Sequence, residues 1–170
     1  MNNLEKLVSH YESLHDGDLT LIGLQPKMCP AGFWTEGYGR VIRDVDGTML
    51  KGVSNKAKAY KLSKIKNVTD AMIALREDLA DYSERVESLH LKINQSQFYA
   101  LVSFAYNVGF NALKGSRLLE LVRSGANATQ IDKEFRKWNK GGGKVLAGLT
   151  ARRTSEAYLY IFGENKFFNL

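Results

Sequence analysis

Residues 29–42 read CPAGFWTEGYGRVI, and this stretch decides the fold class. After a Pro-Ala-Gly turn, residues 33–42 are rich in the aromatic and β-branched side chains that favour strands. A second β-rich run precedes the stretch at residues 19–24, and a second turn signal, Asp-Val-Asp-Gly, follows at residues 44–47. The pattern predicts a small antiparallel sheet, in which the glycines at 37 and 39 let a ligand or another strand approach the backbone closely.

The sequence on both sides of this predicted sheet indicates helices. Residues 3–14 carry apolar side chains at intervals of three and four, which is typical of an amphipathic helix. Thr69 is the predicted N-cap of a long helix that runs to about Leu89, and Asn94 with Gln97 resembles a capping box at the start of the next one. The helices expected after Asn94 cover residues 95–107, 116–123, 128–139 and about 149–163.

Segregated β and α elements of this kind define the α+β class. We expect one domain over residues 1–170, with a small N-terminal lobe of helix plus antiparallel sheet (1–68). A long connecting helix (69–92) and an all-helical C-terminal lobe (93–170) follow. The lysine-rich segment at residues 51–66 is predicted to mix loop and short helix.

The composition is that of an ordinary folded chain. With 170 residues, 44% hydrophobic and 25% charged, it is neither disordered nor a collagen-like repeat. Its one cysteine excludes an intrachain disulfide, and no histidine–cysteine cluster offers a structural zinc site. No apolar run approaches the ~20 residues of a transmembrane helix, and the start lacks a secretory signal. We therefore expect a protein that folds in the cytoplasm.

Positive charge is concentrated in one segment. The net charge is +6, and residues 47–69 contain six lysines and no acidic residue. A local basic surface favours an anionic partner such as nucleic acid, a phosphate-rich cell envelope or acidic lipid. A solvated lysine-rich face without a partner is the alternative, and the sequence leaves both interpretations open. The six lysines of residues 47–69 are Lys51, Lys56, Lys58, Lys61, Lys64 and Lys66.

Two features together point to a catalytic site. Glu12 lies at the end of the first predicted helix, just before the β-rich region, and Thr35 follows Cys29 by six positions. The arrangement resembles the phage-type lysozymes and endolysins of the T-even-like group, glycoside hydrolase family twenty-four. The resemblance covers nearly the whole chain, and further motifs match at residues 94–98, 100–109, 137–139, 142–149 and 152–153.

The resemblance implies a lysozyme-like α+β fold and cleavage of the β-1,4 bond between N-acetylmuramic acid and N-acetylglucosamine in bacterial peptidoglycan. It implies a phage or prophage endolysin for host lysis, a monomer that needs no metal or cofactor. Such an enzyme stays in the host cytoplasm until a membrane-pore protein releases it to the cell wall. Neither a nucleic-acid partner nor a transmembrane segment is expected. Two alternatives stay open: a glycan-binding protein with weakened catalysis, and a lytic transglycosylase.

The resemblance also implies roles for single residues. Glu12 is the predicted acid that protonates the leaving oxygen, as cleavage of a glycosidic bond requires. Cys29 fills the second catalytic position, and since a thiol is a poor base unless a cation lies beside it, we expect it to orient water together with Thr35. Cys29 follows Glu12 by 17 positions, a longer interval than in the family. Asp18 or Glu36 is an alternative base, and a buried structural role is an alternative for Cys29.

Sugar contacts are expected from the helical lobe. Tyr106 and Asn107 match family residues that face the substrate, and Ser116 matches a polar one beyond them. An aromatic ring can stack on a pyranose, while an asparagine amide can bond an acetamido group. The alternative for Tyr106 is packing between helices only.

Other positions are predicted to hold the fold together. Arg40 stands where the family has a histidine, and we expect it to pair with Asp78 on the long helix. Arg152 and Arg153 are interpreted mainly as residues that join the lobes. The two tryptophans, Trp34 and Trp138, are most simply core residues.

Overall fold

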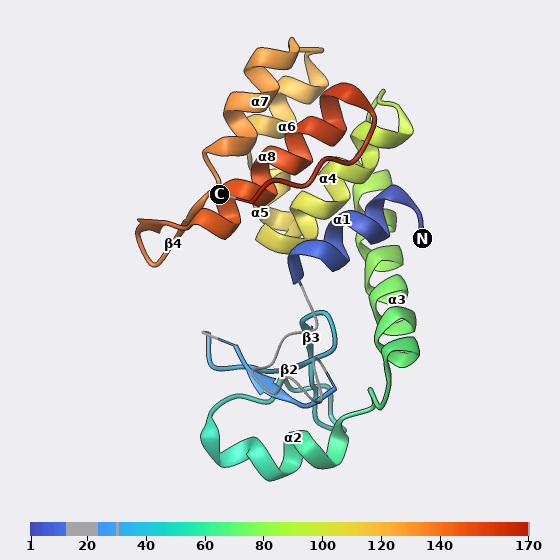
Figure 1. Ribbon diagram of the computed structural model, residues 1–170, viewed down its shortest axis with the longest axis vertical. Coiled ribbons are helices and arrows are strands. Elements are labelled where there is room, and N and C mark those ends of the chain that lie inside the picture. Colours follow the sequence, from blue (N-terminus) through green and yellow to red (C-terminus); the bar gives the residue numbers. More distant parts are fainter. Residues whose placement is uncertain (13–23, 30, 170) are drawn as a thin grey trace. The chain divides into compact units, whose positions relative to one another are not determined.

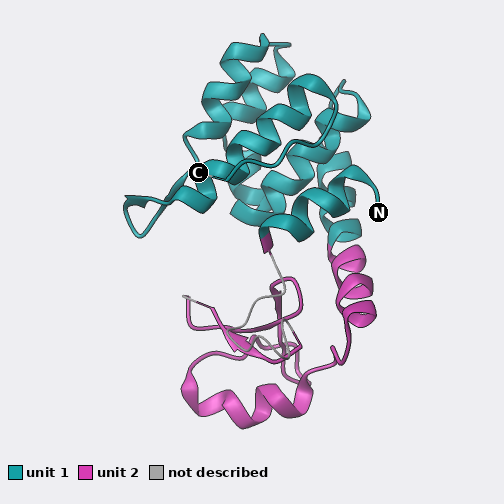
Figure 2. Cartoon of the chain, viewed as in Figure 1, with its two compact units in different colours: residues 1–11, 79–170 teal, residues 12–78 magenta. Residues whose placement is uncertain are grey.

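The computed structural model describes residues 1–12, 24–29 and 31–169 (Figure 1). By its contacts the chain divides into two compact units, a helical unit of residues 1–11 and 79–170 and a sheet unit of residues 12–78 (Figure 2). The first helix therefore groups with the helical unit, whereas the predicted lobe 1–68 joins it to the sheet. Helices together with small antiparallel sheets confirm the α+β class. The single domain stays a prediction.

The sheet unit contains a three-stranded antiparallel sheet in the order β1-β2-β3. The strands are β1 (Lys27–Met28), β2 (Trp34–Glu36) and β3 (Arg40–Val41). The predicted sheet is thus confirmed, but residues 33–42 do not form one strand, because the chain folds back at residues 37–39. Gly37 and Gly39 have φ angles of 56° and 93°, in the left-handed region that glycine adopts without a Cβ clash. The two glycines therefore make a hairpin turn.

The turns predicted around this sheet are confirmed. The Gly32 N–H donates to Cys29 O at 2.8 Å, and the Gly47 N–H donates to Asp44 O at 3.0 Å. The strand predicted at residues 19–24 lies outside the described residues up to residue 23, and Leu24 lies in a turn. The short strand β1 was not predicted.

Gly37→Ala is expected to lower the free energy of unfolding by about 1–3 kcal/mol. A Cβ on Gly37 would lie 2.5 Å from Ile65 Cδ1, and the φ angle is one that alanine adopts only under strain. Gly47→Ala is the control, since Gly47 has a φ of 86° but nothing lies within 4 Å of an added Cβ. Urea denaturation measures both variants. Equal losses would mean that the contact with Ile65 contributes nothing.

Two hydrophobic clusters stabilise the described part of the sheet unit. Trp34 is buried in the first, and its Nε1 donates to Gly52 O at 2.8 Å, which confirms its core position. The other buried members of this cluster are Ile42, Leu50 and Ala59. The second cluster combines Ile65, Ala71 and Ala74 with the partly buried Leu24 and Tyr38. It connects the hairpin turn to the long helix.

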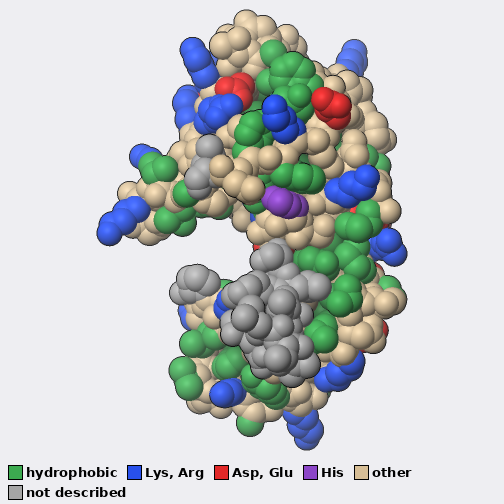
Figure 3. All heavy atoms as spheres, in the orientation of Figure 1, with side chains coloured by type: hydrophobic (Ala, Val, Ile, Leu, Met, Phe, Trp, Pro, Cys, Tyr) green, Lys and Arg blue, Asp and Glu red, His purple; other side chains and the backbone are tan. Residues whose placement is uncertain are grey.

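The lysine-rich segment mixes loop and helix, as predicted. A 3-10 turn, η1 (Val53–Asn55), leads into α2 (Lys56–Leu62), whose Ala59 packs in the cluster around Trp34. All six lysines are exposed, and Lys58 pairs with Asp44. In the space-filling view, basic side chains project from the surface around α2, with hydrophobic ones between them (Figure 3).

The long helix α3 (Val68–Glu87) begins two residues earlier than predicted. Its cap is Asn67, whose Oδ1 accepts a hydrogen bond from the Asp70 N–H at 2.9 Å, so the prediction of Thr69 as the cap is wrong. Asp70 accepts in turn from the Lys66 N–H at 2.9 Å. A side-chain acceptor two residues upstream of the expected cap therefore sets the helix start.

The predicted ion pair between Arg40 and Asp78 is confirmed. Arg40 Nε lies 3.1 Å from both carboxylate oxygens of Asp78, and Arg40 Nη2 lies 3.0 Å from Glu77 Oε2. Burial alone would lower the pKa of Arg40, but the hydrogen bonds and charges of Asp78 and Glu77 outweigh it and raise that pKa. The pair ties β3 to α3 within the sheet unit.

Helices dominate the rest of the chain. They are α1 (Asn3–Glu12), α4 (Gln95–Val108), α5 (Phe110–Lys114), α6 (Arg117–Arg123), α7 (Ala128–Arg136) and α8 (Ala147–Phe162). The capping box of Asn94 and Gln97 is confirmed at the start of α4, and Gly109 ends this helix. α8 packs against α4 and α7, and every residue from 151 to 157 is buried. Trp138 is half-buried, with its ring 5.3 Å from that of Phe104.

A short hairpin lies between α7 and α8. β4 (Lys140–Gly141) pairs with β5 (Lys144–Val145), and Gly142 and Gly143 form its turn with φ angles of 58° and 78°. A two-residue turn with positive φ at both positions matches the twist of a hairpin. The predicted all-helical lobe therefore also holds two strands. None of the helices in the described part of the chain is long and apolar enough to cross a membrane.

Candidate active site

Glu12 lies beside the hairpin of the sheet unit. It is the last residue of α1, and its side chain is half-buried. A Cβ placed on Gly39 would lie 3.5 Å from Glu12 Oε2, so the carboxylate approaches the turn between β2 and β3. At this distance an added Cβ would make an ordinary van der Waals contact with the carboxylate. The Glu12 carboxylate therefore lies next to the turn.

Cys29 and Thr35 belong to one face of the β1–β2 strand pair. Thr35 opposes Lys27 in the register of β1 and β2, so these two side chains lie on the same face. Cys29 follows Lys27 by two residues, and side chains two residues apart on a strand share a face. The ladder continues past β1, because the Cys29 N–H donates to Phe33 O at 2.8 Å. Both side chains are half-buried, and Thr35 Oγ1 donates to Lys27 O at 3.1 Å. The oxygen of Thr35 therefore keeps lone pairs that can accept a hydrogen bond from water.

Glu36 lies on the opposite face of β2 and is only 7% exposed. Its Oε2 accepts hydrogen bonds from Ser63 Oγ at 2.8 Å, the Lys64 N–H at 2.9 Å and the Ile65 N–H at 3.2 Å. A carboxylate oxygen with three donors anchors residues 63–65 to the sheet. The structure therefore does not support Glu36 as the alternative base, while Asp18 lies outside the described residues.

Glu36→Gln is expected to lower the free energy of unfolding by about 1–2 kcal/mol and to retain catalytic activity. The amide oxygen can still accept the bonds from residues 63–65, but it lacks the negative charge that strengthens them. Urea denaturation measures the loss, and glycan hydrolysis per folded molecule measures activity. A fully stable but inactive variant would instead place Glu36 in the catalytic machinery.

Tyr106 and Asn107 lie in the last turn of α4, in the helical unit. The Tyr106 ring is half-buried, and its centroid lies 5.3 Å from that of Tyr82 on α3. Packing between helices thus accounts for part of this side chain. Asn107 is exposed, and its Oδ1 accepts a hydrogen bond from Arg153 Nη2 at 3.0 Å. A sugar contact stays a prediction for both residues.

Ser116 is the N-cap of α6 and is 4% exposed. Its hydroxyl accepts a hydrogen bond from the Leu119 N–H at 3.1 Å and donates one to Leu113 O at 2.7 Å. Both bonds belong to the fold. The structure therefore gives Ser116 a capping role and does not support the predicted sugar contact.

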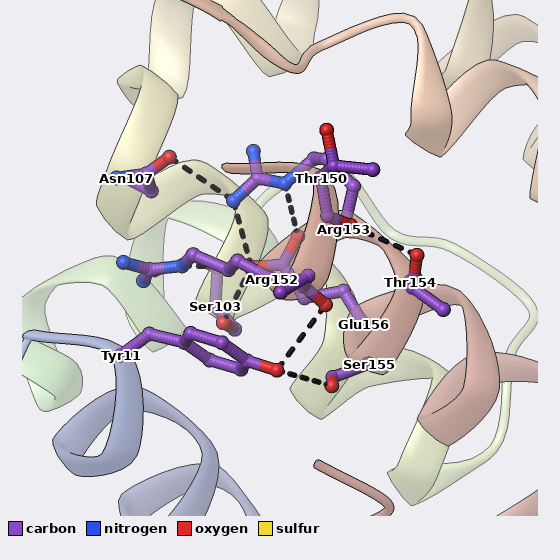
Figure 4. Close-up of polar contacts among 10 residues, drawn as sticks. Tyr11, Ser103, Asn107, Thr150, Arg152, Arg153, Thr154, Ser155 and Glu156 are labelled. Atoms are coloured by element: carbon purple, nitrogen blue, oxygen red, sulfur yellow. Dashed lines mark hydrogen bonds and ion pairs between the residues drawn. The ribbon is translucent and has the colours of Figure 1, made fainter. Parts of the chain in front are cut away.

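A buried ion cluster in the helical unit was not predicted (Figure 4). Glu156 is 0% exposed, and its Oε1 accepts from Ser103 Oγ at 2.7 Å and from Arg152 Nε at 3.2 Å. Arg153 Nε lies 2.9 Å from Glu156 Oε2. Both arginines thus pair with Glu156 within the helical unit, and the interpretation that they also join the lobes stays a prediction. The sequence contains a signal for this cluster. Glu156 follows Arg153 by three residues and Arg152 by four, and side chains at these spacings meet on one helix.

The end of α1 is fixed to α8 (Figure 4). The Tyr11 hydroxyl lies 2.5 Å from Ser155 Oγ and donates to Ala151 O at 3.2 Å. Tyr11 directly precedes Glu12 in the sequence. The core of the helical unit therefore holds the helical turn from which the candidate acid extends.

These features define a class, the α+β proteins of the lysozyme type. A helix ends in a glutamate beside a glycine-turned hairpin, and a separate helical unit carries further polar candidates. The family model described as phage lysozyme matches residues 22–156. The chain belongs to the phage lysozyme family.

Individual relatives agree with this assignment. The endolysin of Bacillus phage B103 is 42% identical over 135 residues, which are 79% of this chain and 45% of that protein. The muramidase domain of SpmX from Asticaccaulis excentricus is 29% identical, with a TM-score of 0.69 over 94% of this chain and 95% of that one. The endolysin of Escherichia coli O157:H7 phage FAHEc1 shares the fold at 23% identity, with a TM-score of 0.72 over 98% and 95%. The chain spans less than half the length of the Bacillus phage endolysin.

Proposed function

We propose that this protein is a peptidoglycan hydrolase, a muramidase that acts as a phage endolysin in host lysis. The bond that it cleaves is the β-1,4 link between N-acetylmuramic acid and N-acetylglucosamine. The observation on which the proposal rests is the Glu12 carboxylate beside Gly39, in the turn that joins β2 to β3. Thr35 lies on β2 of the same sheet, and Cys29 directly follows β1. Relatives described as an endolysin and as a muramidase domain support it.

In the proposed reaction Glu12 donates its proton to the glycosidic oxygen as the bond from that oxygen to C1 breaks. An oxocarbenium-like centre then forms on the muramic acid ring. A water molecule oriented by Thr35 and Cys29 adds to C1, and its extra proton passes to solvent. Glu12 recovers a proton from solvent, so the cycle closes with a new reducing end. These steps require no metal or cofactor.

The substrate contacts and the cellular setting belong to the same proposal. Tyr106 and Asn107 at the end of α4 are the proposed sugar contacts. The enzyme acts as a monomer on bacterial peptidoglycan, without a nucleic-acid partner. It accumulates in the host cytoplasm and reaches the wall when lysis begins.

Digestion of purified peptidoglycan, with mass analysis of the new sugar ends, tests this function. A reducing N-acetylmuramic acid end is the expected product. A 1,6-anhydro end would instead identify a lytic transglycosylase in which Glu12 works without the water-orienting pair. Glycan binding without any new end would identify a binding protein that has lost catalysis.

The lysine-rich segment is proposed to hold the enzyme on the anionic cell wall. Charge reversal of Lys61, Lys64 and Lys66 to glutamate should weaken binding to purified walls by about tenfold at low salt, because exposed cations attract a polyanion. The effect should shrink as salt screens the charges. Co-sedimentation with walls across a salt series measures it.

A matched control changes the same number of charges elsewhere. Reversal of Lys114, Lys133 and Lys140, three exposed lysines of the helical unit, also lowers the formal net charge from +6 to 0. This control should retain most of the wall binding. Equal losses in the two variants would show that net charge, and not the segment, determines binding.

A further inference from the structure

The amide of Asn107 is held in one of its two possible orientations (Figure 4). Its Oδ1 accepts a hydrogen bond from Arg153 Nη2 at 3.0 Å, while the residue itself is exposed. A guanidinium group has only donors, so the amide oxygen has to face Arg153. The Nδ2 group of Asn107 therefore points away from the arginine. The chemistry of the partner determines which end of the amide is available to a ligand.

Arg153 is itself fixed, with 0% of its side chain exposed. Its Nε lies 2.9 Å from Glu156 Oε2, and its Nη2 donates to Glu156 Oε1 at 3.0 Å. The guanidinium carbon lies 4.9 Å from the centre of the Phe104 ring. Ser103 in turn donates to Glu156 at 2.7 Å. One proton of Nη2 thus bonds the buried carboxylate, and the other bonds Asn107.

We propose that Arg153 is a positioning residue that makes Asn107 a hydrogen-bond donor toward substrate. Such a contact selects a sugar substituent with an acceptor oxygen, as the carbonyl of an N-acetyl group provides. The amino group of a deacetylated sugar has no carbonyl oxygen, and in its protonated form it offers only donors. This inference rests on the proposed glycan-cleaving function and adds the group by which the helical unit selects acetylated sugar.

Two soluble probes test the inference through binding. They are a tetramer of N-acetylglucosamine and the same tetramer without its acetyl groups, titrated by calorimetry into the Glu12→Gln protein. Asn107→Asp should lower the affinity for the acetylated tetramer by about tenfold and raise that for the amino tetramer. The carboxylate keeps its bond to Arg153 but has no outward donor. Asn111→Asp on α5, also exposed, is the control with the same change of charge and should leave both affinities unchanged.

Arg153 variants test the positioning role itself. Arg153→Met should reduce the preference for the acetylated tetramer by about threefold to tenfold, because the amide can then rotate. Arg153→Lys keeps a donor and should restore part of the preference. In an Asn107→Ala background Arg153→Met should change the preference by less than about twofold, since a positioning residue acts through its partner. With Glu12 intact, Arg153→Met should raise KM on peptidoglycan more than it lowers kcat.

Several results would overturn the inference. These are an unchanged preference in Asn107→Asp, a further loss from Arg153→Met in the Asn107→Ala background, or no binding of either tetramer. If Arg153→Met does not fold, the two Asn107 variants decide, because Asn107 is exposed and its replacement leaves the buried pair in place. The proposed function fails separately, if the unmodified protein releases no new glycan ends.

Discussion

Glu12→Gln lowers the rate of peptidoglycan hydrolysis by about 100- to 10,000-fold in the result that we expect. Glutamine has nearly the shape of a protonated glutamic acid, so it can occupy the space beside Gly39. It has no acidic proton to transfer to the leaving oxygen, and the departing sugar would have to leave as an alkoxide. Release of reducing ends from purified peptidoglycan measures the rate, and circular dichroism shows that the variant is folded.

Glu5→Gln is the matched control, because it makes the same chemical change on the first turn of the same helix. This variant should retain the full rate. Glu12→Asp should give an intermediate rate, since the aspartic acid still carries an acidic proton but its side chain is one methylene shorter. A fully active Glu12→Gln protein would assign the acid to another residue and remove the main support for the proposed mechanism.

Glu156→Ala is expected to lower the free energy of unfolding by about 3–5 kcal/mol. Glu156 is 0% exposed and bonds both Arg152 and Arg153, which are 3% and 0% exposed. Its removal leaves two buried guanidinium groups without this carboxylate and deprives Ser103 Oγ of its acceptor. Because a domain is stable by only about 5–15 kcal/mol, this single change should remove a large part of the total. Urea denaturation measures it.

Glu120→Ala is the control for burial. Glu120 also pairs with an arginine on its own helix, with its Oε2 2.6 Å from Arg117 Nη1, but both side chains are more than 60% exposed. An exposed pair contributes little, so the expected loss is below about 1 kcal/mol. A similar loss in the two variants would mean that the ion pairs of Glu156 stabilise the helical unit no more than a surface pair does.

Much of the candidate site was predictable because it depends on local sequence. The helix that ends at Glu12 follows from apolar spacing, and the turn after Cys29 follows from its Pro-Ala-Gly signal. Strand alternation also predicted that Thr35 and Glu36 face opposite sides, which the burial pattern of β2 confirms. Glu36 nevertheless stays open in the sequence as an alternative base to Cys29, because alternation does not say which face of the strand is buried.

Ser116 shows that a local signal and a match by position can predict different roles for one residue. A serine directly before a helical run is a common N-cap, and this local signal agrees with its observed role. The resemblance instead placed Ser116 at the substrate. The Gly-Gly pair at residues 142–143 is likewise a turn signal in the sequence, but the hairpin between α7 and α8 is not among the predicted elements.

By itself the sequence determined the α+β class, most helix starts and the order of the catalytic candidates. Caps, turns and periodicity depend on residues within about four positions of one another, so they can be read from a single chain. The tertiary structure alone decided what the polar side chains do. The donors that bond Glu36 lie 27 to 29 positions later in the sequence. Asn107 and Arg153 are 46 positions apart, and Ser103 and Glu156 are 53 positions apart. A buried charge needs specific partners to offset its loss of hydration, and only the packed chain brings those partners within hydrogen-bond distance.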